Sequence, residues 1–317
     1  MPTTKGIMGF VKLTGAGALG KIRVTSLGLR ASQEISAMET IDSVYDYTAY
    51  RLGPVRVEGD IAFPIPVLSN QWNAIITAGA ERNNTTGQMA NKTIMVEANY
   101  DHNIKYKYEN CSVNTMAVSV NSEEAVEVTM NLLGTKRSTA GRQTIASTSP
   151  ERVLTWNEVT VTTGGSMAGS STSRVPEIPS SQVRNFSFEV NNNNTVFFGL
   201  GGEIVAVVNN IVAGKREVTG SMEIAWNQDG LGLQDFAYNV NAENGPDYCS
   251  SNLWINMAID SNCSSSSSPK PLKFHGVMYN MEEISMTNDF FMGTQTWKAY
   301  GEEGNSYRAM SLDGTSI

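Results

Sequence analysis

Residues 113–120 read Val-Asn-Thr-Met-Ala-Val-Ser-Val, and residues 126–132 read Val-Glu-Val-Thr-Met-Asn-Leu. In both stretches apolar side chains alternate with polar or small ones, which is the pattern of a strand with one buried and one solvated face. The same alternation recurs at residues 155–162, 186–190 and 218–226. The sequence therefore predicts a mainly β protein.

Two stretches have helical spacing instead. Residues 67–80 follow two prolines and place Leu68, Trp72, Ile75 and Ile76 on one side of a helix. Residues 32–45 carry apolar side chains at i, i+3 steps and predict a second helix.

The chain also contains an internal repeat. Lys21–Leu27 aligns with Gln182–Phe188, and the Gly53-x5-Gly59 block aligns with Gly214-x5-Gly220, in both cases at an offset of 161 residues (214 minus 53). A later block at Val113 resembles one at Tyr279 with an offset of 166 (280 minus 114). Such order favours two copies of one domain, although alternating strands with glycine turns can also align by accident.

This repeat predicts a division of the chain into five parts. Residues 164–181 are rich in Gly, Ser and Pro and read as a linker, and the run Asn191–Asn194 reads as a hairpin turn. The predicted parts are an N-terminal arm at 1–20, a first domain at 21–163, a linker at 164–181, a second domain at 182–305 and a C-terminal tail at 306–317.

Composition excludes several classes of function. The net charge is −8 and only 17% of residues are charged, so the chain lacks the basic face of a protein that grips phosphates. No apolar run is long enough to cross a membrane, and the N-terminus does not read as a secretory signal. His102 and His275 stand alone, and Gly15–Gly20 fits a dinucleotide-binding glycine pattern but precedes a strand rather than a helix. We therefore expect no catalytic site, no metal and no cofactor.

The three cysteines leave their redox state open. Cys111, Cys249 and Cys263 are either free thiols, or Cys249 and Cys263 form one bridge, or one cysteine bonds to a neighbouring subunit.

The strand blocks resemble the tail tube proteins of long-tailed bacteriophages. The resemblance rests on Val57-Glu58-Gly59-Asp60-Ile61, on the related block Gly214–Ile224, and on the paired strands at 111–116 and 126–130. It implies a β-sandwich with a flanking α-helix, and together with the repeat it predicts two copies of that domain, each with its helix, the second helix lying near residues 233–243. It also implies that strands of neighbouring subunits join in a ring-shaped β-barrel, and that rings stack into a hollow tube in the virion tail. Such a protein is made in the host cytoplasm and is not an enzyme.

The resemblance further implies partners and a lumen. Expected partners are other copies of the chain, the terminator, tape measure and baseplate proteins, and DNA that passes without tight binding. A duplicated domain predicts three chains per ring, with six chains as the alternative. An acidic lumen would let DNA slide, and the candidate lumen-facing residues on the paired strands are Glu123, Glu124, Glu127, Glu282, Glu283 and Asp289. The alternatives are a tail terminator or tube-initiating baseplate protein of related fold, and a carbohydrate-binding β-sandwich.

Overall fold

The structure is a computed structural model. It describes residues 10–14, 21–38, 49–66, 69–82, 89, 94–99, 105–139, 152–165, 178, 180–198, 211–226, 253–259, 270–286, 291–301 and 308–317. The elements up to residue 139 are β1 Phe10–Thr14, β2 Lys21–Arg23, β3 Ser26–Leu27, β4 Arg30–Met38, β5 Ala49–Pro64, α1 Ser69–Ala80, β6 Ile94–Asn99, β7 Lys105–Asn121, β8 Glu127–Gly134 and β9 Lys136–Thr139. The later elements are the 3-10 turns η1 Trp156–Glu158 and η2 Ser180–Gln182, and the strands β10 Val159–Gly164, β11 Val183–Asn191, β12 Thr195–Val196, β13 Ile211–Val212, β14 Glu217–Trp226, β15 Trp254–Ile259, β16 Leu272–His275, β17 Val277–Met286, β18 Phe291–Ala299, β19 Met310–Leu312 and β20 Thr315–Ser316. The prediction of a mainly β protein is confirmed.

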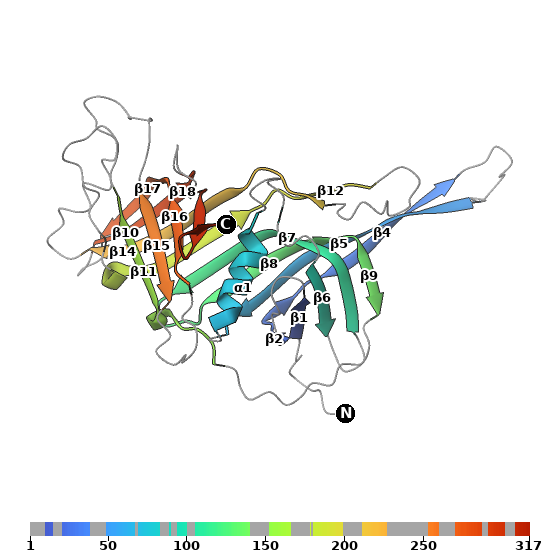
Figure 1. The fold of residues 1–317 in the computed structure, drawn as a ribbon, viewed down its shortest axis with the longest axis horizontal. Helices are drawn as coiled ribbons and strands as arrows, with labels where there is room; N and C mark the ends of the chain where they lie inside the picture. Colours follow the sequence, from blue (N-terminus) through green and yellow to red (C-terminus); the bar gives the residue numbers. More distant parts are fainter. Residues whose placement is uncertain are drawn as a thin grey trace, which may run out of the picture.

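One long antiparallel sheet organises the molecule. Its strands follow the order β4-β5-β8-β7-β11-β14-β18-β17, so elements from both ends of the sequence share one sheet (Figure 1). The sheet does not close into a barrel. Within the described residues β17 pairs only with β18, and β3 and β4 pair only with β5, so each end of this row has an open edge.

Strand β7 leads from the long sheet into a second layer. Its C-terminal half pairs with β8 and β11, whereas its N-terminal half pairs with β6 and β9. β6 continues to β1 and β2. The Tyr108 hydroxyl on the N-terminal half donates to the Leu29 carbonyl at 3.1 Å and so ties the two layers together.

The later half of the long sheet is covered by a separate sheet of order β10-β15-β16-β19-β20. Phe274 of this covering sheet contacts Phe188 and Trp297 of the long sheet, with ring centroids 5.1 Å and 4.8 Å apart. Such aromatic contacts join two sheets face to face, as in a β-sandwich.

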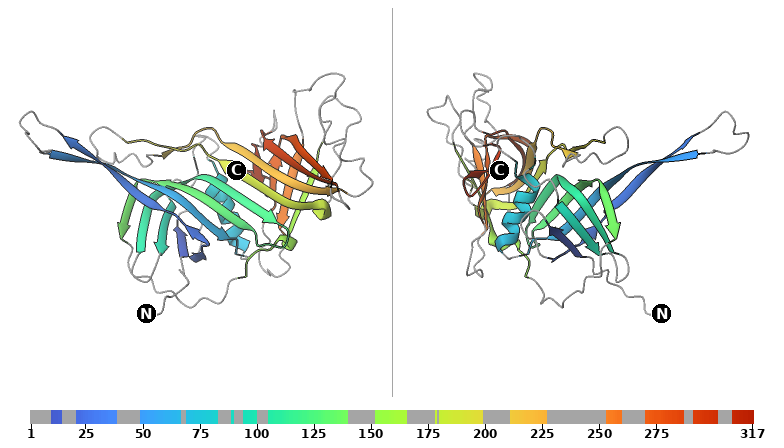
Figure 2. Two further views of the ribbon diagram at one scale, coloured as in Figure 1. Left: turned by 180° about the vertical axis from the view of Figure 1, so that it is seen from behind. Right: turned by 45° about the vertical axis from the view of Figure 1, so that its right-hand side comes forward.

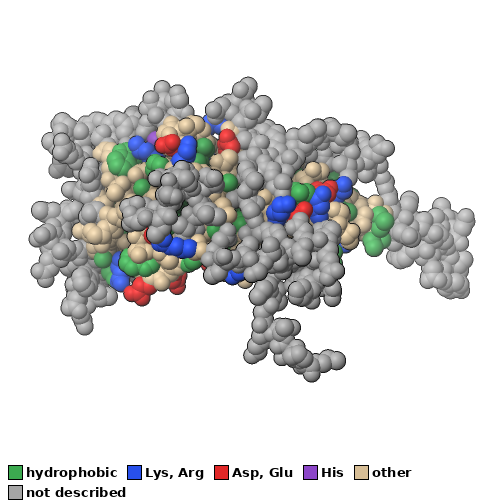
Figure 3. Space-filling model, turned by 60° about the horizontal axis from the view of Figure 1, so that its bottom comes forward, with side chains coloured by type: hydrophobic (Ala, Val, Ile, Leu, Met, Phe, Trp, Pro, Cys, Tyr) green, Lys and Arg blue, Asp and Glu red, His purple; other side chains and the backbone are tan. Residues whose placement is uncertain are grey.

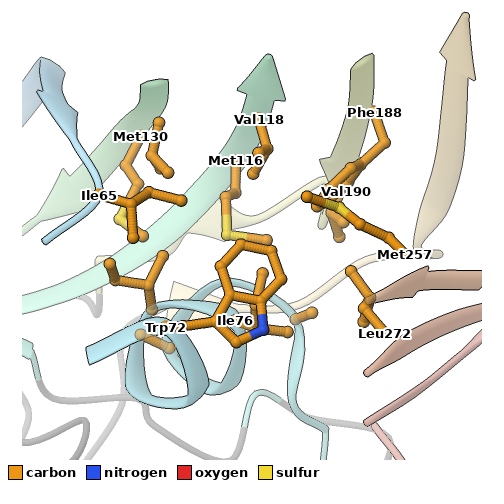
Figure 4. Close-up of a cluster of buried hydrophobic side chains, with 14 of the residues drawn as sticks. Ile65, Trp72, Ile76, Met116, Val118, Met130, Phe188, Val190, Met257 and Leu272 are labelled. Atoms are coloured by element: carbon orange, nitrogen blue, oxygen red, sulfur yellow. The ribbon is translucent and has the colours of Figure 1, made fainter. Parts of the chain in front are cut away.

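Helix α1 packs on the middle of the long sheet. Trp72 and Ile76 point from the helix towards Met116 and Val118 of β7 (Figure 4). Gly79 allows this close approach, because a Cβ there would lie 2.2 Å from the Met116 Sδ atom. The helix predicted over 67–80 from its apolar side is therefore confirmed over Ser69–Ala80.

The second helix predicted from spacing is wrong. Residues 32–38 belong to β4, which pairs with β5 over Gln33↔Val55 and Ile35↔Leu52. Ile35 and Leu52 lie opposite each other and are exposed, so the i, i+3 spacing does not mark a buried helical stripe. The β4–β5 hairpin projects beyond the body of the molecule (Figure 2).

Other expectations also change. The run Asn191–Asn194 is not a hairpin turn. β11 ends at Asn191, and the chain continues through the run to β12, which pairs with β13 beyond residue 210 and not with β11. Residues 10–14 of the expected arm form β1, with Val11 and Leu13 buried, and residues 310–317 of the expected tail form β19 and β20. The predicted helix at 233–243 lies outside the described residues, as does most of the linker at 164–181.

Candidate functional site: the polar face of the long sheet

The long sheet has one apolar and one polar face. Along β7, Met116, Val118 and Val120 are buried in the core, so Ala117 and Ser119 point to the opposite side. Antiparallel pairing carries this alternation across the sheet, since directly paired residues share a face. Ser119 pairs with Ser187 of β11, and Ser187 pairs with Ser221 of β14.

Small hydroxyl side chains line a shallow hollow on this polar face. The hollow has a volume of about 620 Å³. Ser187 and Ser221 exchange a hydrogen bond at 2.9 Å. Hydroxyl residues from five strands contribute to the lining, namely Ser119, Thr129, Ser187, Thr219, Ser221 and Thr296. Met278 and Tyr300, both exposed, also contribute to the lining of the hollow, and Lys298 lies 5.7 Å from the centroid of the Tyr300 ring.

The charged side chains of this face are mixed, with a small acidic excess. The alternation places six carboxylates there: Glu58, Asp60, Glu127, Glu189, Glu217 and Glu223. The cations are Arg30, Arg56, Arg184 and Lys298. On the side of the molecule seen in Figure 3, too, acidic and basic side chains lie interspersed among neutral ones.

Hydrogen bonds and ion pairs hold several of these carboxylates in place. Asp60 accepts from the Asn131 side chain at 2.8 Å, and Glu127 accepts from the Thr25 hydroxyl at 2.8 Å. Glu223 accepts from Asn185. The ion pairs are looser, since Lys298 lies 3.8 Å from Glu217 and Arg30 lies 3.9 Å from Glu58. Exposed pairs at such distances are weak.

The structure separates the residues predicted to face the lumen. Glu127 is the first residue of β8 and lies on the polar face. Glu123 and Glu124 are not on a strand, because β7 ends at Asn121 and the chain turns there, with a positive φ at Glu123. The Glu124 carboxylate accepts from the Asn121 side chain within this turn.

Two of the remaining candidates, Glu282 and Glu283, belong to β17. Glu283 pairs in register with Thr294 of β18, and Glu282 lies at an irregularity in that pairing. The side chains of these two residues, and all of Asp289, lie outside what the structure describes.

Five carboxylates of this face were missed from the sequence: Glu58, Asp60, Glu189, Glu217 and Glu223. A signal for them existed. Each alternates with core residues, as in Phe188-Glu189-Val190 and Met222-Glu223-Ile224.

The described residues contain no group of His, Cys, Asp and Glu side chains that could hold a metal ion. His275 is buried, with its Nε2 atom 2.7 Å from the Ser311 hydroxyl. Burial, together with the nearby Glu109, raises the pKa of the Cys111 thiol to about 12, which keeps it in the unreactive thiol form. His102, Cys249 and Cys263 lie outside the described residues.

A model of the phage tail tube protein family matches residues 3–262, which is most of the chain. The chain belongs to the phage tail tube protein family. No curated protein matches it. Membership makes it a structural protein of the virion tail, in a family whose members self-assemble and contact other tail proteins. None of the helices described here is long and apolar enough to span a membrane.

Proposed function

We propose that the chain assembles into rings that stack as the hollow tail tube, and that the polar face of the long sheet lines the lumen through which DNA passes. The observation that carries this proposal is the open sheet. A sheet with unpaired backbone at both edges is a template for pairing with further chains. Joining edge to edge in a closed ring removes those edges.

Two rows of strand pairs support a duplicated domain. In the first half Ile61 of β5 lies between Leu27 of β3 and Met130 of β8. In the second half Met222 of β14 lies between Phe186 of β11 and Gln295 of β18. The order β3/β4-β5-β8-β7 thus reappears as β11-β14-β18-β17, which supports two copies of one unit that meet where β7 pairs with β11.

The covering layers repeat in the same way. β6 pairs with β1 and with β7, and β15 pairs with β10 and with β16. β10 is then the counterpart of β1 and belongs to the second copy. We therefore place the boundary between the copies before residue 159 rather than in the predicted linker at 164–181.

A chain that supplies two such units would complete a six-unit ring as a trimer. Electron microscopy of purified tubes, combined with native mass spectrometry of single rings, tests this count. We expect three chains per ring with pseudo-six-fold symmetry. Six chains per ring would contradict the trimer but would leave the tube intact.

An acidic lumen would suit DNA passage, since like charge prevents phosphates from binding the wall. The tape measure, terminator and baseplate proteins are the proposed tail partners. If the purified protein forms only single rings, a terminator or a tube-initiating baseplate protein becomes the better assignment. A carbohydrate-binding role would need clustered exposed aromatic side chains. Among the tryptophans whose side chains the structure describes, Trp72 and Trp297 are buried, Trp254 is half-buried and only Trp156 is exposed.

A further inference from the structure

We propose that β17 of one chain pairs antiparallel with residues 27–31 of the next chain, in a register that sets Glu283 opposite Arg30. This inference rests on the proposed ring assembly and specifies which edges meet and how. It uses the contact between β7 and β11 inside the chain as the template for the contact between chains.

The internal contact has a defined register. Ala117 pairs with Glu189, Val118 with Phe188, and Val120 with Phe186. The alternation of core and polar positions continues across this contact without a break. A shift of one residue would turn every side chain of one strand to the wrong face.

The equivalent of β11 in the first half follows from its partner strand. Leu27 lies opposite Ile61, as Phe186 lies opposite Met222. Ile61 and Met222 are themselves equivalent in the repeat. Residues of β11 therefore correspond to residues 159 positions earlier (186 minus 27), which makes Arg30 the counterpart of Glu189. This pairing corrects the sequence alignment of these two segments by two residues, since the offset of 161 matched Leu27 with Phe188.

The equivalent of β7 in the second half follows in the same way. Met130 pairs with Ile61, and Gln295 pairs with Met222, so Met130 and Gln295 are equivalent. Two positions earlier on each strand, Val128 therefore corresponds to Gly293. Val128 pairs with Val118, and Gly293 pairs with Ile284. Residues 117–120 therefore correspond to residues 283–286, which makes Glu283 the counterpart of Ala117.

The transferred register pairs residues of matching chemistry. Ile284 meets Leu29 and Met286 meets Leu27, so apolar residues meet apolar residues. Glu283 meets Arg30, where the internal contact has Ala117 and Glu189. The Arg30 side chain is 76% exposed, and its ion pair with Glu58 is long, at 3.9 Å. The guanidinium is therefore accessible to a second carboxylate. Opposite charges at a directly paired position stabilise antiparallel strands.

A charge-swap series tests the register. The variants are Arg30→Glu, Glu283→Arg and the double variant, with Arg30→Glu/Glu282→Arg as the matched control one residue away. We expect each single variant to raise the critical concentration for tube assembly on the order of two- to fivefold, and the double variant to restore it. The folded chain should melt normally in every case, since both residues lie on open edges.

Cysteine pairs give an independent readout. Leu29→Cys with Ile284→Cys should yield disulfide-linked multimers on a non-reducing gel after mild oxidation of assembled tubes. Leu29→Cys with Ser285→Cys, which is one residue out of register, should not. Two results would overturn the register even if tubes form. One is restored assembly in the Arg30→Glu/Glu282→Arg control, and the other is a crosslink from Leu29→Cys with Ser285→Cys but not from Leu29→Cys with Ile284→Cys. Failure of the unaltered chain to form rings or tubes would instead overturn the proposed function.

Discussion

Gly59 is a residue at which backbone conformation constrains the sequence. Its φ is +149°, and a Cβ there would lie 2.3 Å from the Gly28 carbonyl oxygen. We expect Gly59→Ala to lower the free energy of unfolding by about 1–3 kcal/mol, because both strain and a backbone clash oppose the added methyl group. Gly28→Ala is the matched control, since its added Cβ would sit 3.5 Å from the nearest atom outside its chain neighbours. Urea denaturation of both variants measures the effect, and equal losses would contradict the prediction.

Glu109 gives the stability a specific dependence on pH. Hydrogen bonds from Lys107 and then from Lys136, at 2.7 Å and 2.9 Å, lower the pKa of its carboxyl from 4.5 to about 2. A carboxyl whose pKa is lower in the folded state stabilises the fold above its unfolded pKa, and this stability is lost as pH falls through the folded value. The difference in unfolding free energy between wild type and Glu109→Gln should therefore be constant above about pH 5 and shrink between pH 4.5 and 2. A difference that persists unchanged at pH 2.5 would refute this assignment.

Buried side-chain hydrogen bonds connect the C-terminal end of helix α1 to the segments that follow β11 and precede β14. The Asn192 side chain donates to the Gly79 carbonyl at the C-terminal end of α1 and to the Val113 carbonyl of β7, at 2.8 Å and 3.1 Å. Arg216 donates to the Ala80 carbonyl, and burial, with the nearby Arg82 and Arg308, lowers its pKa to about 10. These bonds satisfy helix carbonyls that would otherwise be unpaired in the interior.

We expect Asn192→Ala to destabilise the fold by about 1–3 kcal/mol, because the buried Gly79 carbonyl loses its side-chain donor and the Val113 carbonyl keeps only the bond from Asn194 at 2.8 Å. Asn193→Gly is the control from the same run, since Asn193 is exposed and its φ of +48° suits glycine. Thermal unfolding distinguishes the two variants. A smaller loss for Asn192→Ala than for Asn193→Gly would show that the buried bonds contribute little.

The sequence predicts elements well where the pattern is local. Alternation located β7, β8, β11 and β14, and the spacing of Trp72, Ile75 and Ile76 located α1. It failed at β4, because Ile35 and Met38 fit a helical step and only pairing with β5 makes the segment a strand. The pairing of β10 with β15, about 95 residues apart (254 minus 159), leaves no local signal at all.

The candidate site shows the same limit. Glu127 could be placed because it alternates with Val126 and Val128, which are buried. Glu123 and Glu124 were misplaced because the sequence does not mark where β7 ends, although the positive φ at Glu123 requires a turn there. Glu58 and Asp60 could have been found by carrying the alternation through Val57 and Ile61.

For the whole molecule, the open sheet and its acidic polar face lead to a prediction about DNA passage. Glu189 and Glu223 lie on that face in the second half of the chain, and their reversal to Lys changes the local charge by +4 in each subunit. Because every ring repeats the change, we expect Glu189→Lys/Glu223→Lys to leave tubes intact but to slow DNA ejection. Added salt should relieve the delay by screening the charges.

The control is Glu97→Lys on β6, which belongs to the other layer, and virions with this variant should eject DNA at the normal rate. Ejection triggered from purified virions and followed with a DNA-binding dye measures the rate. Normal ejection at low salt through tubes that contain the double variant would mean that this face does not line the lumen.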